Sequence, residues 1–322
     1  MSEFKKYTPQ IIYIMGRGHS GSTILDLLLG NAENVESVGE LLSGMGRLDS
    51  QCSCGAKIKN CEFWTNVRNF TKKEKNLVDE MNWGDLVKIS HYFGHIYRFP
   101  RIFFSKMWPM QKIIEKYKLG TIALFNSIAK AAISKVVVDS SKEVTRGLFL
   151  ALFLPNVRII HLVRNGEQIL ASNLWRMKIG EGFKFLRRKW KAKHFHGLFL
   201  ILSSISWVIG NLLAELVGLC VPDCIIRIHY EDLCEKPEEV LEKIGAFIEC
   251  DMSSVISAVK NNKLMKIGHN IAGNRIRMRK TFKFNPKSRL HLLPKSYQIF
   301  FRIIAMPLIL HYGYPSFYKI HK

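Results

Sequence analysis

The stretch YIMGRGHSGSTILDLLLG, residues 13–30, constrains the fold more than any other part of the chain. An apolar run typical of a buried strand leads into a turn of small and polar residues, and an apolar run typical of a helix follows. Because the first amides of a helix attract an anion, the turn has the form of a phosphate-binding loop. The lysine of the G-x-x-x-x-G-K-[ST] motif is absent, since a serine stands at position 22.

The turn supplies its own candidate ligands for an anion. Gly18 and Gly21 allow the backbone to approach a ligand closely. Hydroxyl donors come from Ser20, Ser22 and Thr23. We expect Arg17 or His19 to supply positive charge in place of the missing lysine.

Short apolar runs alternate with helical patterns along most of the chain, as in a parallel sheet covered by helices on both sides. Strands are predicted at 10–15, 35–38, 135–142, 156–164 and 223–233. Helices are predicted from about 23 and 143, then at 165–178, 237–248 and 294–312. We therefore expect an α/β fold, a three-layer sandwich with a central, mainly parallel sheet. A single domain over 8–322 would carry a cysteine-containing loop (44–69) and a helical insertion (to 130) on its acceptor side.

The charge balance favours a polyanionic partner. The 322 residues carry a formal net charge of +22, which suits a phosphate-rich cofactor, an acidic substrate or an anionic membrane. No helix-turn-helix, RNP or zinc-finger pattern appears, so nucleic acid is not an expected partner. An odd count of seven cysteines is a poor match for a disulfide framework and favours a cytoplasmic, reducing location. The start MSEFKKYTPQ has no apolar region typical of a signal peptide.

One segment, 197–220, has the length of a membrane span. Asn211 and Glu215 interrupt it, and charge at mid-bilayer is costly, so we predict a buried helix and keep membrane contact as the alternative. The preceding residues, 183–196, are basic with interleaved aromatics. They are typical of a solvated helix face, or of a surface that would hold the protein at the inner face of an anionic membrane.

A second constellation narrows the function. Arg164 ends a predicted strand, and Ser172 follows eight residues later on the next predicted helix. This arrangement resembles the element with which sulfotransferases that use 3′-phosphoadenosine 5′-phosphosulfate (PAPS) hold the 3′-phosphate. GRGHSGST resembles the family's 5′-phosphosulfate loop, and the segment beginning IRIHYEDL, with Tyr230, is similar to its YEDL…P element. HNIAGNRIRMR resembles the loop that covers the nucleotide. The similarity covers most of the chain except roughly residues 50–130.

The resemblance implies a P-loop-like fold and a PAPS-dependent sulfotransferase with no required metal. Its acceptor would be a hydroxyl or amine on an unidentified glycan, lipid or small molecule, sulfated by in-line displacement. Around the 5′-phosphosulfate it implies Arg17, Gly18, His19, Ser20, Gly21, Ser22 and Thr23. Around the rest of the nucleotide it implies Arg164, Ser172, Tyr230 and Asn274, with Arg275 or Arg277 closing over it.

Candidates for the chemistry come from three places. Glu40 follows the short second strand, and a comparison with the tyrosylprotein sulfotransferases places it on their catalytic glutamate, so the resemblance implies a general base. Lys142, in an element similar to the family's D-S-S-K, would neutralise charge on the sulfuryl group, with Asp139 or Ser141 positioning it. His19 stands where many members carry arginine or lysine and would act as a donor or an acid.

Three cysteines, Cys52, Cys54 and Cys61, lie close together in CSCGAKIKNCEFW. Zinc usually takes four ligands, and this spacing is not that of a standard zinc ribbon, although His91 and His95 could share a helix face. The pattern CGxxxxxCxFW resembles a loop of some bacterial sulfotransferases. We therefore interpret the segment as a structural loop, with a labile disulfide as an alternative, and predict no metal site.

Two other classes of function stay open. A P-loop kinase would use Asp139 for Mg²⁺, but the loop lysine on which kinases depend is missing. A non-catalytic, basic protein bound to a membrane or another polyanion would fit the charge alone. Binding of adenosine 3′,5′-bisphosphate without Mg²⁺ would favour a sulfotransferase over a kinase. Binding to a polyanion that moderate salt abolishes would favour the non-catalytic protein.

Overall fold

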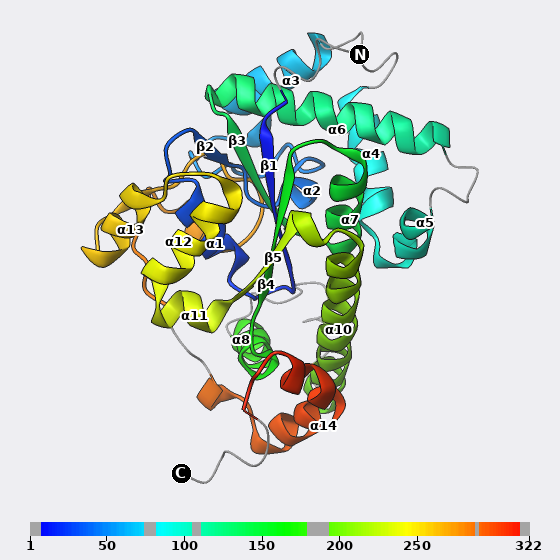
Figure 1. Ribbon diagram of the computed structural model, residues 1–322, viewed down its shortest axis with the longest axis vertical. Coiled ribbons are helices and arrows are strands. Elements are labelled where there is room, and N and C mark those ends of the chain that lie inside the picture. The colour runs from blue at the N-terminus through cyan, green and yellow to red at the C-terminus, as the bar shows by residue number, and fades with distance from the viewer. Residues whose placement is uncertain (1–7, 74–81, 105–110, 179–192, 287–289, 316–322) are drawn as a thin grey trace.

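A five-stranded parallel sheet forms the centre of the molecule (Figure 1). The structure is a computed structural model that describes residues 8–73, 82–104, 111–178, 193–286 and 290–315. The strands are β1 (Gln10–Gly16), β2 (Val35–Ser37), β3 (Val136–Lys142), β4 (Val157–Val163) and β5 (Ile225–His229). Their order is β2-β3-β1-β4-β5, and every neighbouring pair is parallel. The predicted α/β class is confirmed.

The side chains of β1 divide the core into two layers. Successive residues of a strand point to opposite faces. Ile11, Tyr13 and Met15 enter one hydrophobic cluster, and Ile12 and Ile14 enter the other. Because every one of these side chains is fully buried, helices must cover both faces of the sheet, and a three-layer sandwich results.

Helices of two different parts of the chain cover the two faces. One face packs against α2 (Leu41–Gly44), α3 (Glu62–Lys73), α4 (Trp83–Gly94), α5 (Phe99–Phe103), α6 (Gln111–Ala132) and α7 (Val144–Phe153). The other packs against α1 (Ser22–Leu29), α11 (Tyr230–Glu235), α12 (Pro237–Ile248) and α13 (Ser253–Lys260), with the short antiparallel pair β6 (Met265–Lys266) and β7 (Thr281–Phe282).

Two sequence predictions need correction. The loop expected over 44–69 ends at Cys61, because α3 begins at Glu62 and buries Phe63 and Trp64. The strand expected over 223–233 ends at His229, and the YEDL residues open α11 instead. Glu231 and Asp232 in the first turn of that helix favour this start, since acidic side chains interact well with a helix N-terminus.

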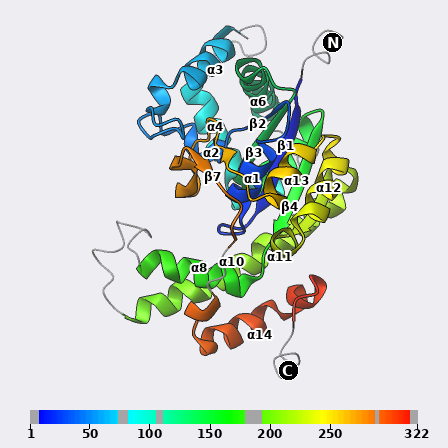
Figure 2. The ribbon, with the colours of Figure 1, turned by 90° about the vertical axis from the view of Figure 1, so that its left-hand side faces the viewer.

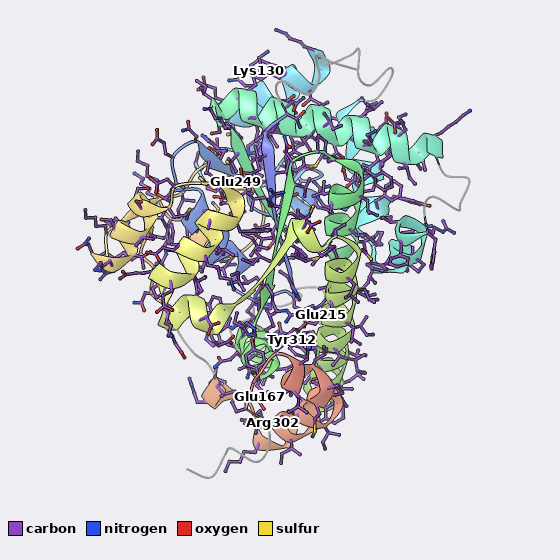
Figure 3. All side chains as sticks on the ribbon, in the orientation of Figure 1. Lys130, Glu167, Glu215, Glu249, Arg302 and Tyr312 are labelled. Carbon is purple, nitrogen blue, oxygen red and sulfur yellow. The ribbon has the colours of Figure 1, made fainter. Side chains whose placement is uncertain are left out.

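A third cluster lies beyond one end of the sheet, where α8 (Gly166–Lys178), α10 (Lys193–Cys220) and α14 (Lys295–His311) pack together (Figure 2). Polar pairs join α14 and the residue after it to the other two helices, and Figure 3 labels their members Glu167, Arg302, Glu215 and Tyr312. Arg302 Nη2 donates to Glu167 Oε2 of α8 over 3.1 Å. The Tyr312 hydroxyl donates to Glu215 Oε1 of α10 over 2.9 Å.

Residues 197–220 form the predicted helix, but the prediction that this helix is buried is wrong. By length and composition Gly197–Cys220 could cross a membrane, and 33% of its most apolar stretch is buried. The polar residues Asn211 and Glu215 face the protein, where they contact His161 of β4. The outward positions are apolar and exposed: Leu198, Leu202, Ile205, Ile209, Leu212, Leu216 and Leu219. The helix therefore keeps its polar residues on the side that packs against the protein and exposes an apolar stripe on the other side.

Candidate active site

The phosphate loop joins β1 to α1 at the carboxyl edge of the sheet, and it adopts a tight turn. His19 has φ 68° and Gly21 has φ 96°, both in the left-handed region. Ser20 is fully buried, and its Oγ has no hydrogen-bond partner among the described residues. A buried hydroxyl without a partner is costly and suits a bound anion. The loop therefore fits a phosphate or sulfate group.

Arg164 connects this loop to the junction between β4 and α8. Its Nη1 donates to the carbonyl oxygen of His19 over 2.8 Å. Ser172 of α8 lies beside the same residue, with its Oγ 3.5 Å from His19 Nδ1. The Asn165 side chain accepts from the Glu167 N–H over 2.8 Å and caps α8. The structure thus brings together His19, Arg164 and Ser172, three residues of the predicted site.

Arg176 is a site residue that the sequence reasoning missed. Its Nη1 lies 3.5 Å from His19 Nε2. The signal was present in the sequence, because Arg176 follows Ser172 by four residues and residues at this spacing share a helix face. Two guanidinium groups, of Arg164 and Arg176, therefore contact His19 in the loop that lacks the lysine.

Tyr230, the first residue of α11, packs between the loop and Arg164. The Arg164 guanidinium carbon lies 4.4 Å from the centroid of the Tyr230 ring, a cation–π contact. A methyl group at Gly21 would overlap the ring carbons of Tyr230. Glycine at position 21 is thus required both by its backbone conformation and by the tyrosine beside it.

Glu40 and Lys142 form an ion pair at the same edge of the sheet. Their side chains are 18% and 17% exposed, respectively. Lys142 ends β3 in the left-handed conformation, with φ 73°, next to a register shift in the pairing of β1 with β3. A strained residue of this kind is frequent at functional sites. The predicted base and the predicted cation therefore lie together.

Residues 268–278 form a segment that covers the loop and Glu40. The Asn270 side chain donates to Asp26 Oδ2 over 2.8 Å, and burial raises the pKa of the Asp26 carboxyl to about 7. A Cβ at Gly273 would lie 3.3 Å from Glu40 Oε1 and 3.4 Å from Thr23 Oγ1. The segment therefore reaches both the phosphate loop and the candidate base.

The predicted closing residues of this segment lie in different surroundings. The Asn274 N–H donates to Thr23 Oγ1 over 3.4 Å, which places Asn274 against the loop. Arg277 donates to the carbonyl oxygens of Gln51 and Asn270 at 2.9 and 3.3 Å. Its guanidinium thus holds protein backbone, and Arg275, which is exposed, is the better candidate to close over a nucleotide.

Two further residues differ in placement from the simplest expectation. Arg17 points away from the loop and donates to Ser206 of α10, so its predicted grip on an anion requires another rotamer. Asp139 forms a fully buried ion pair with Arg146, at 3.0 Å, and accepts a hydrogen bond from the Ser141 N–H at 2.9 Å. Asp139 therefore does not touch Lys142, and its carboxylate is taken up within the core.

The comparison with protein families identifies the class. Residues 9–254 match the profile of the sulfotransferase family. The match spans the phosphate loop, Glu40, Lys142 and the Arg164 junction, so the chain belongs to the sulfotransferase family and is a transferase of sulfuryl groups. A search of curated proteins gives no match.

Solved structures of the same fold are similar over nearly the whole chain. Sulfotransferase STF9 from Mycobacterium avium is 13% identical with a TM-score of 0.51, over 96% of this chain and 78% of that one. The sulfotransferase domain from the curacin biosynthetic pathway is 17% identical with a TM-score of 0.49, over 96% of this chain and 99% of that one. The likeness to STF9 agrees with the P-loop-like fold.

Replacing Gly21 by alanine should destabilise the protein by at least about 2 kcal/mol, because a left-handed L-residue costs about 1–2 kcal/mol and the methyl group would overlap Tyr230. Urea unfolding measures the change. Gly18→Ala is the matched control, since nothing lies within 4 Å of its Cβ position, and it should change the free energy of unfolding by less than about 0.5 kcal/mol. Equal losses in the two variants would contradict this account of the loop.

Proposed function

We propose that the protein transfers a sulfuryl group from PAPS to a hydroxyl or amine group of an acceptor. The observation that carries the proposal is the contact of Arg164 with the His19 carbonyl, which sets two anion-binding junctions side by side. PAPS is a donor with anionic groups at both ends of its ribose, so it needs two such junctions. Neither junction depends on a metal ligand.

The two junctions divide the donor between them. The amides of residues 21–23, at the N-terminus of α1, and the Ser20 hydroxyl would hold the 5′-phosphosulfate. Arg164 and Ser172 would hold the 3′-phosphate, since a guanidinium fork matches phosphate oxygens. Arg176, which lies beside the imidazole of His19, would add charge between them, and this is our answer to the missing lysine.

The chemistry would use the pair at the end of β3. Glu40 would accept the proton of the acceptor as its oxygen or nitrogen attacks sulfur in line, and the bond from sulfur to the phosphate oxygen breaks. The products are the sulfated acceptor, adenosine 3′,5′-bisphosphate and a proton. Lys142, already beside Glu40, would stabilise negative charge on the sulfuryl oxygens as they leave the donor.

A P-loop kinase fits the site less well. Its Mg²⁺ would need the carboxylate of Asp139, in the middle of β3. That carboxylate is fully buried and paired with Arg146. A non-catalytic polyanion-binding protein would not need an acid–base pair such as Glu40 and Lys142 next to the loop.

The helical insertion would carry the acceptor. Gly94 of α4 packs so closely on Leu42 that a Cβ there would clash with it, and α2 begins one residue after Glu40. The insertion is therefore adjacent to the proposed base. It also exposes four large apolar side chains: Ile96, Tyr97, Phe103 and Phe104. An acceptor with an apolar or ring-containing part would suit this surface.

We also propose that the protein works at the cytoplasmic face of an anionic membrane. Helix α10 exposes an apolar stripe, and the neighbouring helix α14 also exposes apolar side chains: Ile299, Ile303, Met306 and Leu310. The net charge of +22 complements anionic lipid. Residues 183–192 of the basic segment predicted to touch lipid lie outside the described residues. Free thiols at all seven cysteines suit the reducing cytoplasm.

Transfer of radiolabelled sulfate from PAPS into an extract of the source cells tests the function directly. Glu40→Gln should lower the label transferred by at least about 100-fold, because it removes a general base, while the affinity for adenosine 3′,5′-bisphosphate stays within about threefold. The control Glu33→Gln alters an exposed carboxylate and should transfer as the native chain does. The proposal would be contradicted if the protein transferred a phosphoryl group from ATP and no sulfuryl group from PAPS, or if it used neither donor.

Vesicle co-sedimentation tests the membrane proposal. Replacing both Leu202 and Ile209 by glutamate should weaken binding to vesicles of anionic phospholipid by at least about tenfold, since each buried leucine or isoleucine contributes about 1.5–3 kcal/mol. Leu264→Glu, at an exposed leucine outside the stripe, should bind as the native chain does. Unchanged vesicle binding, with loss of a dimer in the double variant, would show that the stripe pairs with a second copy instead.

A further inference from the structure

The three cysteines of the loop after α2 meet a histidine from a distant part of the chain. Sγ of Cys54 and Sγ of Cys61 are 3.6 Å apart. Nδ1 of His269 lies 3.4 Å from Sγ of Cys61 and 3.8 Å from Sγ of Cys52. All four atoms lie within 4.8 Å of one another. Four side chains therefore direct sulfur or nitrogen at one point.

The three separations of 3.4, 3.6 and 3.8 Å match the edges of a tetrahedral zinc site. Zinc binds cysteine sulfur at about 2.3 Å and histidine nitrogen at about 2.0–2.1 Å. In a tetrahedron with these bonds, two sulfurs are about 3.8 Å apart and a sulfur and a nitrogen about 3.5 Å apart. Three thiols and one imidazole also select zinc over Mg²⁺ or Ca²⁺, which prefer oxygen.

The surroundings hold the four groups in place. The backbone N–H of Cys61 donates to the Lys57 carbonyl oxygen over 2.8 Å. The Phe63 ring stacks on the imidazole of His269, with centroids 4.7 Å apart and planes 6° apart. The Trp64 indole donates to the His269 carbonyl over 2.9 Å. Such outer contacts orient metal ligands.

We propose that Cys52, Cys54, Cys61 and His269 bind one structural Zn²⁺ ion. A site with four protein ligands has no open position for substrate, so its role is to hold the fold. This site departs from the sequence prediction of no metal. The fourth ligand is His269, and not His91 or His95.

The ion would fix the segment that covers the phosphate loop. His269 precedes Asn270, whose carbonyl accepts from Ser53 N–H over 3.1 Å, and Ile271 N–H donates to the Val38 carbonyl over 2.9 Å. Gly273 then reaches Glu40 and Thr23. The consequence for nucleotide affinity rests on the proposed function, whereas zinc binding itself does not.

Metal content and X-ray absorption test the site on the native chain. The protein is produced in medium containing zinc and purified under reducing conditions. We expect one zinc per chain, with three sulfurs at about 2.3 Å and one nitrogen at about 2.0 Å. A folded native chain that holds no zinc would overturn the proposal, whatever the oxidation state of Cys54 and Cys61. So would a zinc shell built mainly of oxygen.

Substitutions identify the ligands. Cys61→Ser and His269→Ala should each retain less than a tenth of the zinc, whereas Cys220→Ser, at an exposed cysteine outside the cluster, should retain all of it. Because a ligand variant can fail to fold, the native chain is also melted with and without a zinc chelator. A melting temperature lowered by the chelator and restored by added Zn²⁺ supports the proposal, and an unchanged one contradicts it. If the native chain holds zinc but does not bind adenosine 3′,5′-bisphosphate, the proposed function is refuted and the zinc site is not.

Discussion

The proposed site depends on the contacts that the guanidinium of Arg164 makes. This group donates to the His19 carbonyl of the phosphate loop and lies over the Tyr230 ring, so it joins the ends of β1, β4 and β5. Strands of a parallel sheet all end at one edge, and the crevice outside this edge is where open α/β folds bind ligands. The sheet thereby converts three distant segments into one cationic site.

The site differs from a lysine-based phosphate loop in how its charge is held. A single lysine is a compact charge on a flexible stem, whereas guanidinium groups are planar and present several donors. Arg164 and Arg176 reach His19 from the β4–α8 junction and from α8 itself. Lys142 stands apart beside Glu40. Separate cations of this kind suit a donor with separated anionic groups.

The sequence was sufficient to predict the parts of the molecule that a local pattern of residues identifies. Buried runs located the strands, and the Arg164 to Ser172 spacing located the second junction. It was insufficient where contacts depend on tertiary packing. His269 lies 208 residues from Cys61, so no local spacing pairs them. Asn211 and Glu215 favoured a buried helix. Both side chains form polar contacts on the side of the helix that faces the protein, and the opposite side is apolar and exposed.

The most direct measurement is a comparison of two nucleotides on two proteins by calorimetry. Against adenosine 3′,5′-bisphosphate, Arg164→Ala should bind about 10–100-fold more weakly than the native chain, because a charged hydrogen bond contributes about 1.5–3 kcal/mol. Against adenosine 5′-monophosphate, which lacks the 3′-phosphate, the variant should lose less affinity than against the bisphosphate, because only the contact of Arg164 with the loop carbonyl is then lost. If the variant lost affinity equally for both nucleotides, or for neither, Arg164 would not hold the 3′-phosphate and the account of two joined anion sites would be wrong.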